Sequence, residues 1–270
     1  MINVENIQKK FGDKVVIEGI SAQMRAGQCS LIIGASGSGK TVLMKCMVGL
    51  LTPDQGSIYY NGNSFTAMDH KSKTLIRKEI GMLFQGSALF DSLTVEENIM
   101  FPLNMFTKDS TGEKLKRVNT VLDRVNLSGI NKKYPAELSG GMKKRVALAR
   151  AIVLNPKYLF CDEPNSGLDP QTSLVIDKLI RDLTLEHQIT TVINTHDMNS
   201  VMEIGDYILF MHQGKKDWEG TRKEIIFSKN QQLNDFIFAS EFLKDAKDMR
   251  MLEETGKIPN DRDLDQMIQP

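Results

Sequence analysis

Residues 34–41 read GASGSGKT, and their first residue, Gly34, is the last residue of the apolar run CSLIIG at residues 29–34. The stretch matches GxxxxGK[ST], the pattern of a loop that binds phosphate between a buried strand and a helix. Such a loop holds an anion because backbone N–H groups and the N-terminus of the next helix point at it. Lys40 would add a positive charge for the outer phosphates, and the Thr41 hydroxyl would bind Mg²⁺. A plain Gly-rich turn is the alternative, but it would not need a buried strand before it and a helix after it.

Strand and helix signals alternate on both sides of this loop. Short runs rich in Val and Ile predict strands at residues 2–8, 15–24, 29–34, 56–62, 79–84, 158–161 and 189–194. Apolar residues at helical spacing predict helices at residues 41–50, 115–125, 142–153 and 176–183. The second half therefore reads as βαβ winding, and a helix-rich segment is inserted into an α/β core.

Composition and charge narrow the class of protein. The 270 residues are 41% hydrophobic and 25% charged, which is typical of a globular, water-soluble chain. Lys and Arg together number 34, as do Asp and Glu, so no net charge attracts nucleic acid or anionic lipid. The three cysteines lack metal-binding spacing and favour a reducing compartment. Without a secretory signal or an apolar run of about 20 residues, we expect a cytoplasmic protein that meets a membrane only through a partner.

Two carboxylates follow the apolar run YLFC at residues 158–161. Asp162 stands where a phosphate-loop protein places the carboxylate that holds the metal's water shell. Glu163 is one residue further and could polarise a water for attack on the γ-phosphate. A solvated glutamate at a strand end is the alternative for Glu163.

The sequence LSGGM at residues 138–142 lies between these two phosphate motifs. Ser139 is a good helix N-cap, and the paired glycines leave backbone N–H groups open, which alone would indicate only the start of a helix. Together with both phosphate motifs, LSGG resembles the signature of ABC-type ATPases over about residues 2–230. The resemblance implies a P-loop NTPase of ABC type, with a RecA-like α/β core, an N-terminal antiparallel β-subdomain and an inserted helical subdomain. We expect the ATPase domain at residues 1–240, the helical subdomain at about 88–155, and a charged tail at 241–270 that is disordered or clasps a partner.

The same resemblance gives roles to further residues. Gln85 matches the glutamine that reaches Mg²⁺ and the attacking water, and His196 matches the histidine that contacts the γ-phosphate. Both follow predicted strands, at the edge where open α/β sheets bind ligands. The sequence SGLD at residues 166–169 matches a loop that crosses the dimer interface. Phe11 matches the aromatic residue that stacks on adenine, with an ordinary core aromatic as the alternative.

The expected cofactors are ATP and Mg²⁺. The expected catalytic residues are Glu163, His196 and Gln85, and the expected metal ligands are Thr41, Gln85 and Asp162. The residues expected to contact the nucleotide or its phosphates are Phe11, Gly34, Ala35, Ser36, Gly37, Ser38, Gly39, Lys40, Thr41, Val42, Gln85, Ser139, Gly140, Gly141, Asp162 and Asp169.

Two stretches resemble one branch of the family. Residues 83–103, LFQGSALFDSLTVEENIMFPL, and LSGGM with Met142 where Gln is usual, are similar to the ATPases of Mla-type (MCE) lipid transporters. This resemblance implies an ATPase homodimer at the cytoplasmic face of a bacterial inner membrane. The dimer would drive a permease pair joined to an MCE-domain lipid-binding protein and move phospholipid between membranes. Asn165, where Thr is frequent, and Asn194 depart from the common pattern without removing a group that hydrolysis needs.

The segment after Gln85 is expected to dock on the permease. Thr94 and Glu97 form a capping-box pattern that starts a short helix, and Pro102 is expected to limit its length. More apolar side chains surround this helix than it can bury, namely Leu89, Phe90, Leu93, Ile99, Met100, Phe101, Leu103, Met105 and Phe106. An exposed apolar patch of this kind marks a partner surface, whereas ordinary packing into the helical subdomain is the alternative.

Other classes of protein explain less. A soluble ABC ATPase, such as one serving iron–sulfur cluster assembly, would share every phosphate motif but need no permease-docking surface. A chromosome or DNA-repair ATPase would need long heptad arms or basic tracts, for which the spacing from Lys40 to Asp162 leaves no room. A metabolic P-loop kinase would explain neither LSGGM nor SGLD.

Overall fold

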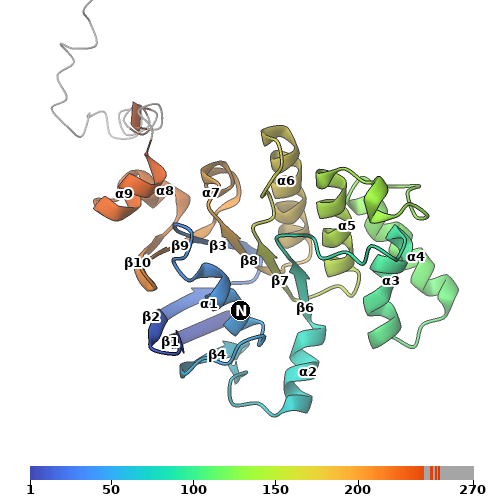
Figure 1. The fold of residues 1–270 in the computed structure, drawn as a ribbon, viewed down its shortest axis with the longest axis horizontal. Helices are drawn as coiled ribbons and strands as arrows, with labels where there is room; N and C mark the ends of the chain where they lie inside the picture. The colour runs from blue at the N-terminus through green and yellow to red at the C-terminus, as the bar shows by residue number, and fades with distance from the viewer. Residues whose placement is uncertain (240–243, 246, 248, 250–270) are drawn as a thin grey trace, which may run out of the picture.

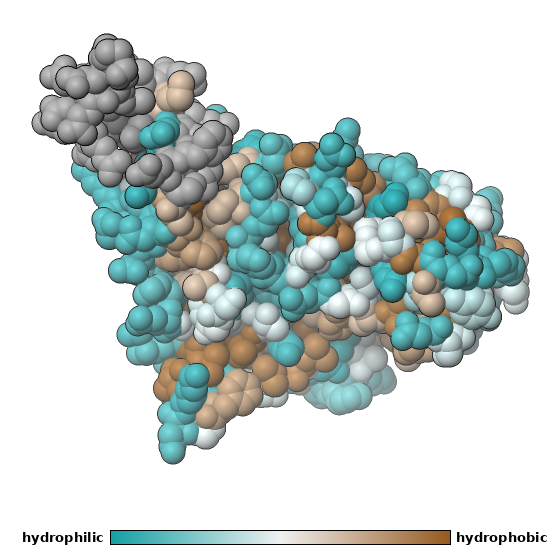
Figure 2. Space-filling model, turned by 45° about the horizontal axis from the view of Figure 1, so that its top comes forward, coloured by the Kyte–Doolittle hydropathy of each residue, from teal (hydrophilic) through white to brown (hydrophobic). Residues whose placement is uncertain are grey.

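A computed structural model describes residues 1–239, 244, 245, 247 and 249 (Figure 1). The rest of the tail expected at residues 241–270 lies outside the described residues, and the boundary at 240 stays a prediction. Two sheets organise the described chain, a six-stranded sheet in the order β10-β9-β3-β8-β7-β6 and a four-stranded sheet in the order β2-β1-β4-β5. On the face drawn in Figure 2, hydrophilic residues dominate and hydrophobic ones reach the surface in separate groups.

The six-stranded sheet forms the centre of the molecule. Its strands are β3 (Gln28–Ile33), β6 (Ile80–Leu83), β7 (Tyr158–Asp162), β8 (Thr190–Thr195), β9 (Tyr207–His212) and β10 (Lys215–Gly220). All neighbouring strands pair in parallel except β9 with β10. Every residue of β7 and β8 is buried, as expected for strands covered on both faces.

Helices and the second sheet cover the two faces of this sheet. Leu31 and Ile33 face one core, which they share with residues of α5 (Gly140–Ile152) and α6 (Pro170–Glu186). Ile32 faces the other core, which it shares with α1 (Lys40–Met47) and the smaller sheet. Figure 1 shows α6 and α7 (Met198–Ile204) on one side and α1 with β1 and β2 on the other.

The smaller sheet is antiparallel and consists of β1 (Ile2–Phe11), β2 (Lys14–Met24), β4 (Gln55–Tyr60) and β5 (Asn63–Ser64). The predicted turn at Gly12 and Asp13 lies between β1 and β2, where Phe11 pairs with Lys14. Helix α1 contacts both sheets, so the start of the phosphate-loop helix lies between them.

The helix-rich segment lies at one end of the molecule (Figure 1). It contains α3 (Val95–Phe106), α4 (Thr111–Arg124), a short 3₁₀ turn at Pro135–Glu137, and α5, and these three α-helices pack on one another. Helix α2 (His70–Lys78) has no predicted counterpart because none of its residues is buried. It is instead started by Asp69, whose carboxylate accepts a hydrogen bond from the backbone N–H of Ser72 at 2.7 Å.

Helix α3 begins at the predicted capping box, where the backbone N–H of Thr94 donates to Glu97 at 2.7 Å. The expectation that Pro102 limits this helix is wrong, because α3 continues through Pro102 to Phe106. Proline removes the hydrogen bond to the carbonyl four residues earlier, and its ring crowds that carbonyl. Ile99 and Leu103 are fully buried on either side of it, and this packing keeps the helix intact.

Between β8 and residue 239, the short helices α7, α8 (Arg222–Ile226) and α9 (Gln231–Ile237) accompany strands β9 and β10. None of the described helices is long and apolar enough to cross a membrane.

Candidate active site

Most of the predicted site residues come together at the carboxyl ends of three parallel strands. The phosphate loop follows β3, Asp162 ends β7, and His196 comes directly after β8. These strands border a cleft of about 640 Å³. The residues that line it are Lys14, Val15, Val16, Ser36, Gly37, Gly39, Lys40, Thr41, Val42, Gln85, Glu163, His196, Gln213 and Gly214.

Two glycines of the phosphate loop have no room for a side chain. Gly34 has a φ of +148°, and a Cβ there would lie 2.2 Å from the carbonyl oxygen of Met211. Gly39, the residue before α1, has a φ of +102°, and its Cβ would lie 2.9 Å from the carbonyl oxygen of Val16. The loop therefore needs glycine at both positions in order to approach the neighbouring strands.

Lys40 is buried within this loop and donates from Nζ to the carbonyl oxygens of Gly34 at 2.7 Å and Ala35 at 3.2 Å. Burial lowers the pKa of Lys40, and the negative charges of Glu163 and Asp162 raise it. The Ser38 hydroxyl is buried and has no hydrogen-bond partner among the described residues. An ammonium and an unused hydroxyl in a bend of backbone N–H groups fit a phosphate ligand.

Asp162, at the end of β7, accepts hydrogen bonds from a hydroxyl and from an amide. Its Oδ1 accepts hydrogen bonds from Thr41 Oγ1 at 3.2 Å and from Asn194 Nδ2 at 3.0 Å. The hydroxyl and carboxylate oxygens of Thr41 and Asp162 therefore lie side by side, next to the phosphate loop. Oxygen donors of this kind, together with substrate phosphates, are the ligands that Mg²⁺ prefers.

Glu163 and His196, predicted from separate motifs, are in direct contact. His196 Nδ1 lies 2.8 Å from Glu163 Oε2. The backbone of Glu163 is left-handed, with a φ of +50°, and its N–H donates to the carbonyl of Asn194 at 2.9 Å. Two contacts with the end of β8 therefore hold Glu163 at the cleft: the His196 side chain contacts its carboxylate, and the Asn194 carbonyl binds its backbone N–H.

Nine of the expected nucleotide contacts are not among the residues that line this cleft. Four of them, Gly34, Ala35, Ser38 and Asp162, lie in or against the phosphate loop, and the other five lie away from it. Ser139 is the exposed N-cap of α5, and Asp169 is the exposed N-cap of α6. Gly140 is also exposed, and Gly141 packs on Thr172 of α6. Phe11 is 49% exposed at the end of β1. Their contacts with nucleotide stay predictions.

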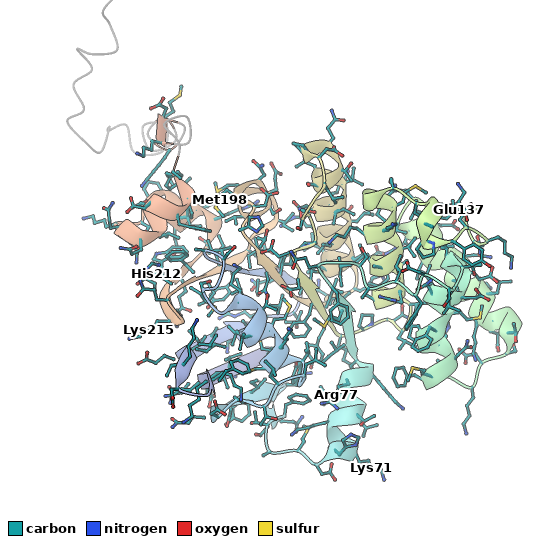
Figure 3. The ribbon with its side chains drawn as sticks, in the orientation of Figure 1. Lys71, Arg77, Glu137, Met198, His212 and Lys215 are labelled. Carbon is teal, nitrogen blue, oxygen red and sulfur yellow. The ribbon has the colours of Figure 1, made fainter. Side chains whose placement is uncertain are left out.

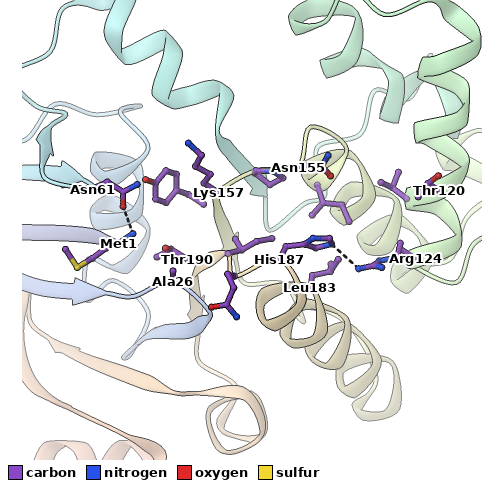
Figure 4. Close-up of a pocket in the computed structure, with 16 residues that line it drawn as sticks. Met1, Ala26, Asn61, Thr120, Arg124, Asn155, Lys157, Leu183, His187 and Thr190 are labelled. Carbon is purple, nitrogen blue, oxygen red and sulfur yellow. Dashed lines mark hydrogen bonds between the residues drawn. The ribbon is translucent and has the colours of Figure 1, made fainter.

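A second cavity of about 410 Å³ lies at the opposite, amino-terminal edge of β7 and β8 (Figure 4). No predicted site residue lines it. Its cations already have partners in the chain, because Arg124 pairs with Glu186 and Lys157 pairs with Glu79. The cleft at the carboxyl ends is therefore the candidate active site.

A family model described as ABC transporter matches residues 17–166. The chain belongs to the ABC transporter family. It is the ATP-hydrolysing subunit of such a transporter, and its fold is the P-loop fold of ABC ATPases, with an antiparallel β-subdomain beside the central sheet.

Named relatives and a solved structure resemble this ABC ATPase over most of its length. The methionine import ATP-binding protein MetN of Campylobacter jejuni is 38% identical over 259 residues, which cover 90% of this chain and 77% of that protein. The chloroplastic protein TRIGALACTOSYLDIACYLGLYCEROL 3 of Arabidopsis thaliana is 36% identical over 256 residues, which cover 89% of this chain and 74% of that protein. A dimeric ATP-binding cassette, solved in a post-hydrolysis state with ADP and Pi, has 30% identity and a TM-score of 0.76, covering 82% of this chain and 99% of that one.

Some residues of the ABC ATPase site have no signal in the sequence. The turn of Gln213 and Gly214, flanked by His212 and Lys215 in Figure 3, lies beside β2, where Gly214 accepts a hydrogen bond from the N–H of Glu18 at 2.9 Å. This contact joins segments almost 200 residues apart, so no local pattern predicts it. Asn194 is different, because an amide at the end of the buried run ITTVIN is a local signal for a positioned polar group.

A buried network fastens the loop after Glu163. Asn165 donates from Nδ2 to Asp177 Oδ1 at 2.8 Å and to Ser200 Oγ at 2.9 Å, and Ser200 donates to Asp177 Oδ2 at 2.8 Å. Asn165 thereby joins the loop after β7 to α6 and to α7, so the departure from Thr at this position has a structural use.

This network predicts a pH dependence of stability. Burial raises the pKa of Asp177 to about 6, above the ordinary value of 3.8 that applies in the unfolded chain. The folded state therefore takes up a proton as the pH falls through 6, and this contribution to stability is lost as the pH rises through 6. Relative to Asp177→Asn, we expect the free energy of unfolding to be roughly 2 kcal/mol larger at pH 4.5 than at pH 7.5, which means a more stable fold at the lower pH. Urea unfolding at both values measures this, with the exposed Asp182→Asn on α6 as a control; parallel profiles of wild type and Asp177→Asn would contradict it.

Proposed function

We propose that this ABC ATPase powers a bacterial inner-membrane transporter of the Mla (MCE) type, which moves phospholipid between membranes. The stretch at residues 83–103 and the LSGGM variant support this branch. One relative is named after trigalactosyldiacylglycerol, a galactolipid, whereas another is named for methionine import. Import of a small solute is therefore the second candidate for the cargo.

The observation that carries the proposal is an exposed apolar surface on and before α3. We call Phe90, Phe101, Met105 and Phe106 the α3 surface; their exposed fractions are 43%, 40%, 60% and 39%. The rings of Phe90 and Phe101 are in contact, with centroids 4.9 Å apart. Such a group on a water-exposed face indicates a partner surface. Ile99 and Leu103 are fully buried, and Leu89 and Met100 pack against the same core, so the packing alternative holds for these four residues.

A short loop and the side chain of Arg150 connect the α3 surface to the cleft. Gln85 lines the cleft, and Phe90 follows five residues later in the same loop. Arg150 lies over the Phe90 ring at 5.9 Å and also donates to the carbonyls of Ser87 and Ala88. A permease that presses on the α3 surface would therefore change the position of the Gln85 loop.

The ATPase would act as a homodimer on a pair of permease subunits that carries an MCE-domain lipid-binding protein, at the cytoplasmic face of the inner membrane. The exposed LSGG residues lie outside the chain's own cleft, which supports a head-to-tail dimer in which each ATP contacts both chains. Thr41 and Asp162 would hold Mg²⁺ with the phosphates of ATP, and the ion would neutralise charge there. Within this site, Lys40 binds the phosphates, Glu163 orients the attacking water, and His196 holds the Glu163 carboxylate.

Charged substitutions on the α3 surface test the docking. Phe101→Glu combined with Met105→Glu should leave the isolated ATPase folded, with turnover within about twofold of wild type, because both side chains already face water. The same variant should leave the membrane fraction, since a charge cannot be buried against an apolar partner. Leu93 is half-buried and therefore a poorer choice.

Phe227→Glu is the matched control, because Phe227 is 39% exposed but lies at the end of α8. It should stay with the membrane fraction. If the α3 variant does not fold, the residues of the α3 surface are core residues of the helical subdomain and not a docking surface. Absence of the unmodified chain from membranes would favour the soluble ABC ATPase, such as one serving iron–sulfur cluster assembly.

A further inference from the structure

Three residues beside the cleft have a backbone conformation that is unusual without glycine. Ser87, Ala88 and Glu163 have φ values of +63°, +49° and +50°. Residues with a Cβ rarely adopt this left-handed backbone region. Such a strained conformation persists only where contacts with the surrounding structure stabilise it. The first two belong to the loop after Gln85, and the third is the expected catalytic carboxylate.

Cations of α5 bind the carbonyl groups of all three residues. Arg150 donates to the carbonyl of Ser87 at 2.9 Å and to that of Ala88 at 2.8 Å. Lys144 donates from Nζ to the carbonyl of Glu163 at 3.2 Å, and it also donates to the carbonyl of Gln85. One helix therefore binds the backbone on both sides of the cleft.

Lys144 does this as a buried charge. Its side chain is 4% exposed, and it forms no ion pair within the part of the chain that the structure describes. Burial lowers the pKa of Lys144, and the nearby groups of Cys161, Glu163 and Asp162 raise it. A cation in this position is costly unless dipoles or charges compensate for it, and two carbonyl oxygens do so here.

The position of Lys144 on α5 is otherwise a core position. Gly141, Leu148 and Ile152 lie on the same face of the helix and are buried. An apolar side chain would fill such a site without the cost of removing a charge from water. The hydrogen bonds that the ammonium donates to the two loops therefore account for a lysine at this position.

We propose that Lys144 is a positioning residue for ATP hydrolysis, because its ammonium joins the backbone of Gln85 to the backbone of Glu163. These two hydrogen bonds keep a constant distance between Gln85, whose amide is expected at Mg²⁺, and Glu163, whose carboxylate is expected at the attacking water. This inference rests on the roles proposed above for Gln85 and Glu163. Since Ser139 is the N-cap of α5, a movement of the LSGG residues on the partner's nucleotide would also reach both loops of the chain's own site.

Lys144→Met tests the inference, because methionine fills similar space and removes the charge and its hydrogen bonds. We expect kcat for ATP to fall about 10- to 100-fold, since small displacements of catalytic groups have effects of this size. KM should stay within about twofold, because Lys40 and the phosphate loop do not contact Lys144. Lys144→Arg, which keeps a cation with several donors, should restore kcat to within about threefold of wild type.

Lys143→Met is the matched control. Lys143 is the preceding residue of α5, and its side chain makes no hydrogen bond or ion pair with any residue that the structure describes. Its kcat should equal that of wild type. Equal kcat values for Lys144→Met and Lys143→Met would overturn the proposal, as would a fall that Lys144→Arg does not reverse.

If Lys144→Met does not fold, Lys144→Gln decides the question. Its neutral amide can bind one carbonyl, so a reduced kcat with unchanged KM supports the proposal, and wild-type kinetics overturns it. The assignment of the site itself is tested separately by Glu163→Gln. Normal turnover in that variant would remove the site assignment, whereas its inactivity beside a fully active Lys144→Met would remove only the role of Lys144.

Discussion

Glu163→Gln is expected to abolish ATP turnover while ATP binding persists. Glutamine has the same shape and can still contact His196, but it has lost the carboxylate that accepts a proton from the attacking water. A general base contributes about 10²- to 10⁴-fold to a rate, so kcat should fall by at least about 100-fold. Lys40, Ser38 and the loop N–H groups are unchanged, and nucleotide affinity should therefore stay within about threefold.

Phosphate release and titration with a fluorescent ATP analogue measure the two effects separately. Lys40→Ala is the contrasting variant, because it removes the cation from the phosphate loop and should weaken binding itself. Near-normal turnover in Glu163→Gln would remove Glu163 from its role.

A mixture of two inactive variants is expected to regain activity. Lys40→Ala removes the phosphate-binding cation of a chain, and Ser139→Arg places a bulky cation at the exposed start of α5, outside that chain's own cleft. If each ATP lies between the phosphate loop of one chain and the LSGG residues of the other, a heterodimer has one intact site. Random pairing then gives about a quarter of the wild-type turnover, because half of the dimers carry one working site of two.

Each variant alone provides the baseline, because homodimers of either variant should not hydrolyse ATP. The mixed sample is measured by phosphate release after equilibration. A mixture as inactive as either variant alone would show that sites are not shared between chains.

Local patterns in the sequence predict the parts of the fold whose determinants are local. The phosphate loop needs glycines at particular positions between a strand and a helix, and Asp162 follows a short apolar run that predicts the buried strand β7. The capping box of Thr94 and Glu97 also forms as predicted. In each case, the residues that determine the structure are neighbours in the chain.

Long-range packing decides what the sequence could not show. The course of α3 through Pro102 depends on the burial of Ile99 and Leu103 against other helices. The contact of Lys144 with the loops of Gln85 and Glu163 joins residues 59 and 19 positions apart. The sequence predicts the apolar face of this helix from Met142, Val146, Ala149 and Val153. Lys144 lies on the opposite side of that pattern, where a lysine is ordinarily solvated.

Phospholipid transfer by the intact complex is the measurement that shows whether this ATPase powers lipid transport. A tag on this chain would isolate the complex from native membranes, and the complex would be reconstituted into vesicles that contain a fluorescent phospholipid. We predict transfer of the label that requires ATP and that is lost when the complex carries Glu163→Gln. ATP hydrolysis by the wild-type complex without any phospholipid transfer, together with stimulation by a small solute such as methionine, would contradict the account.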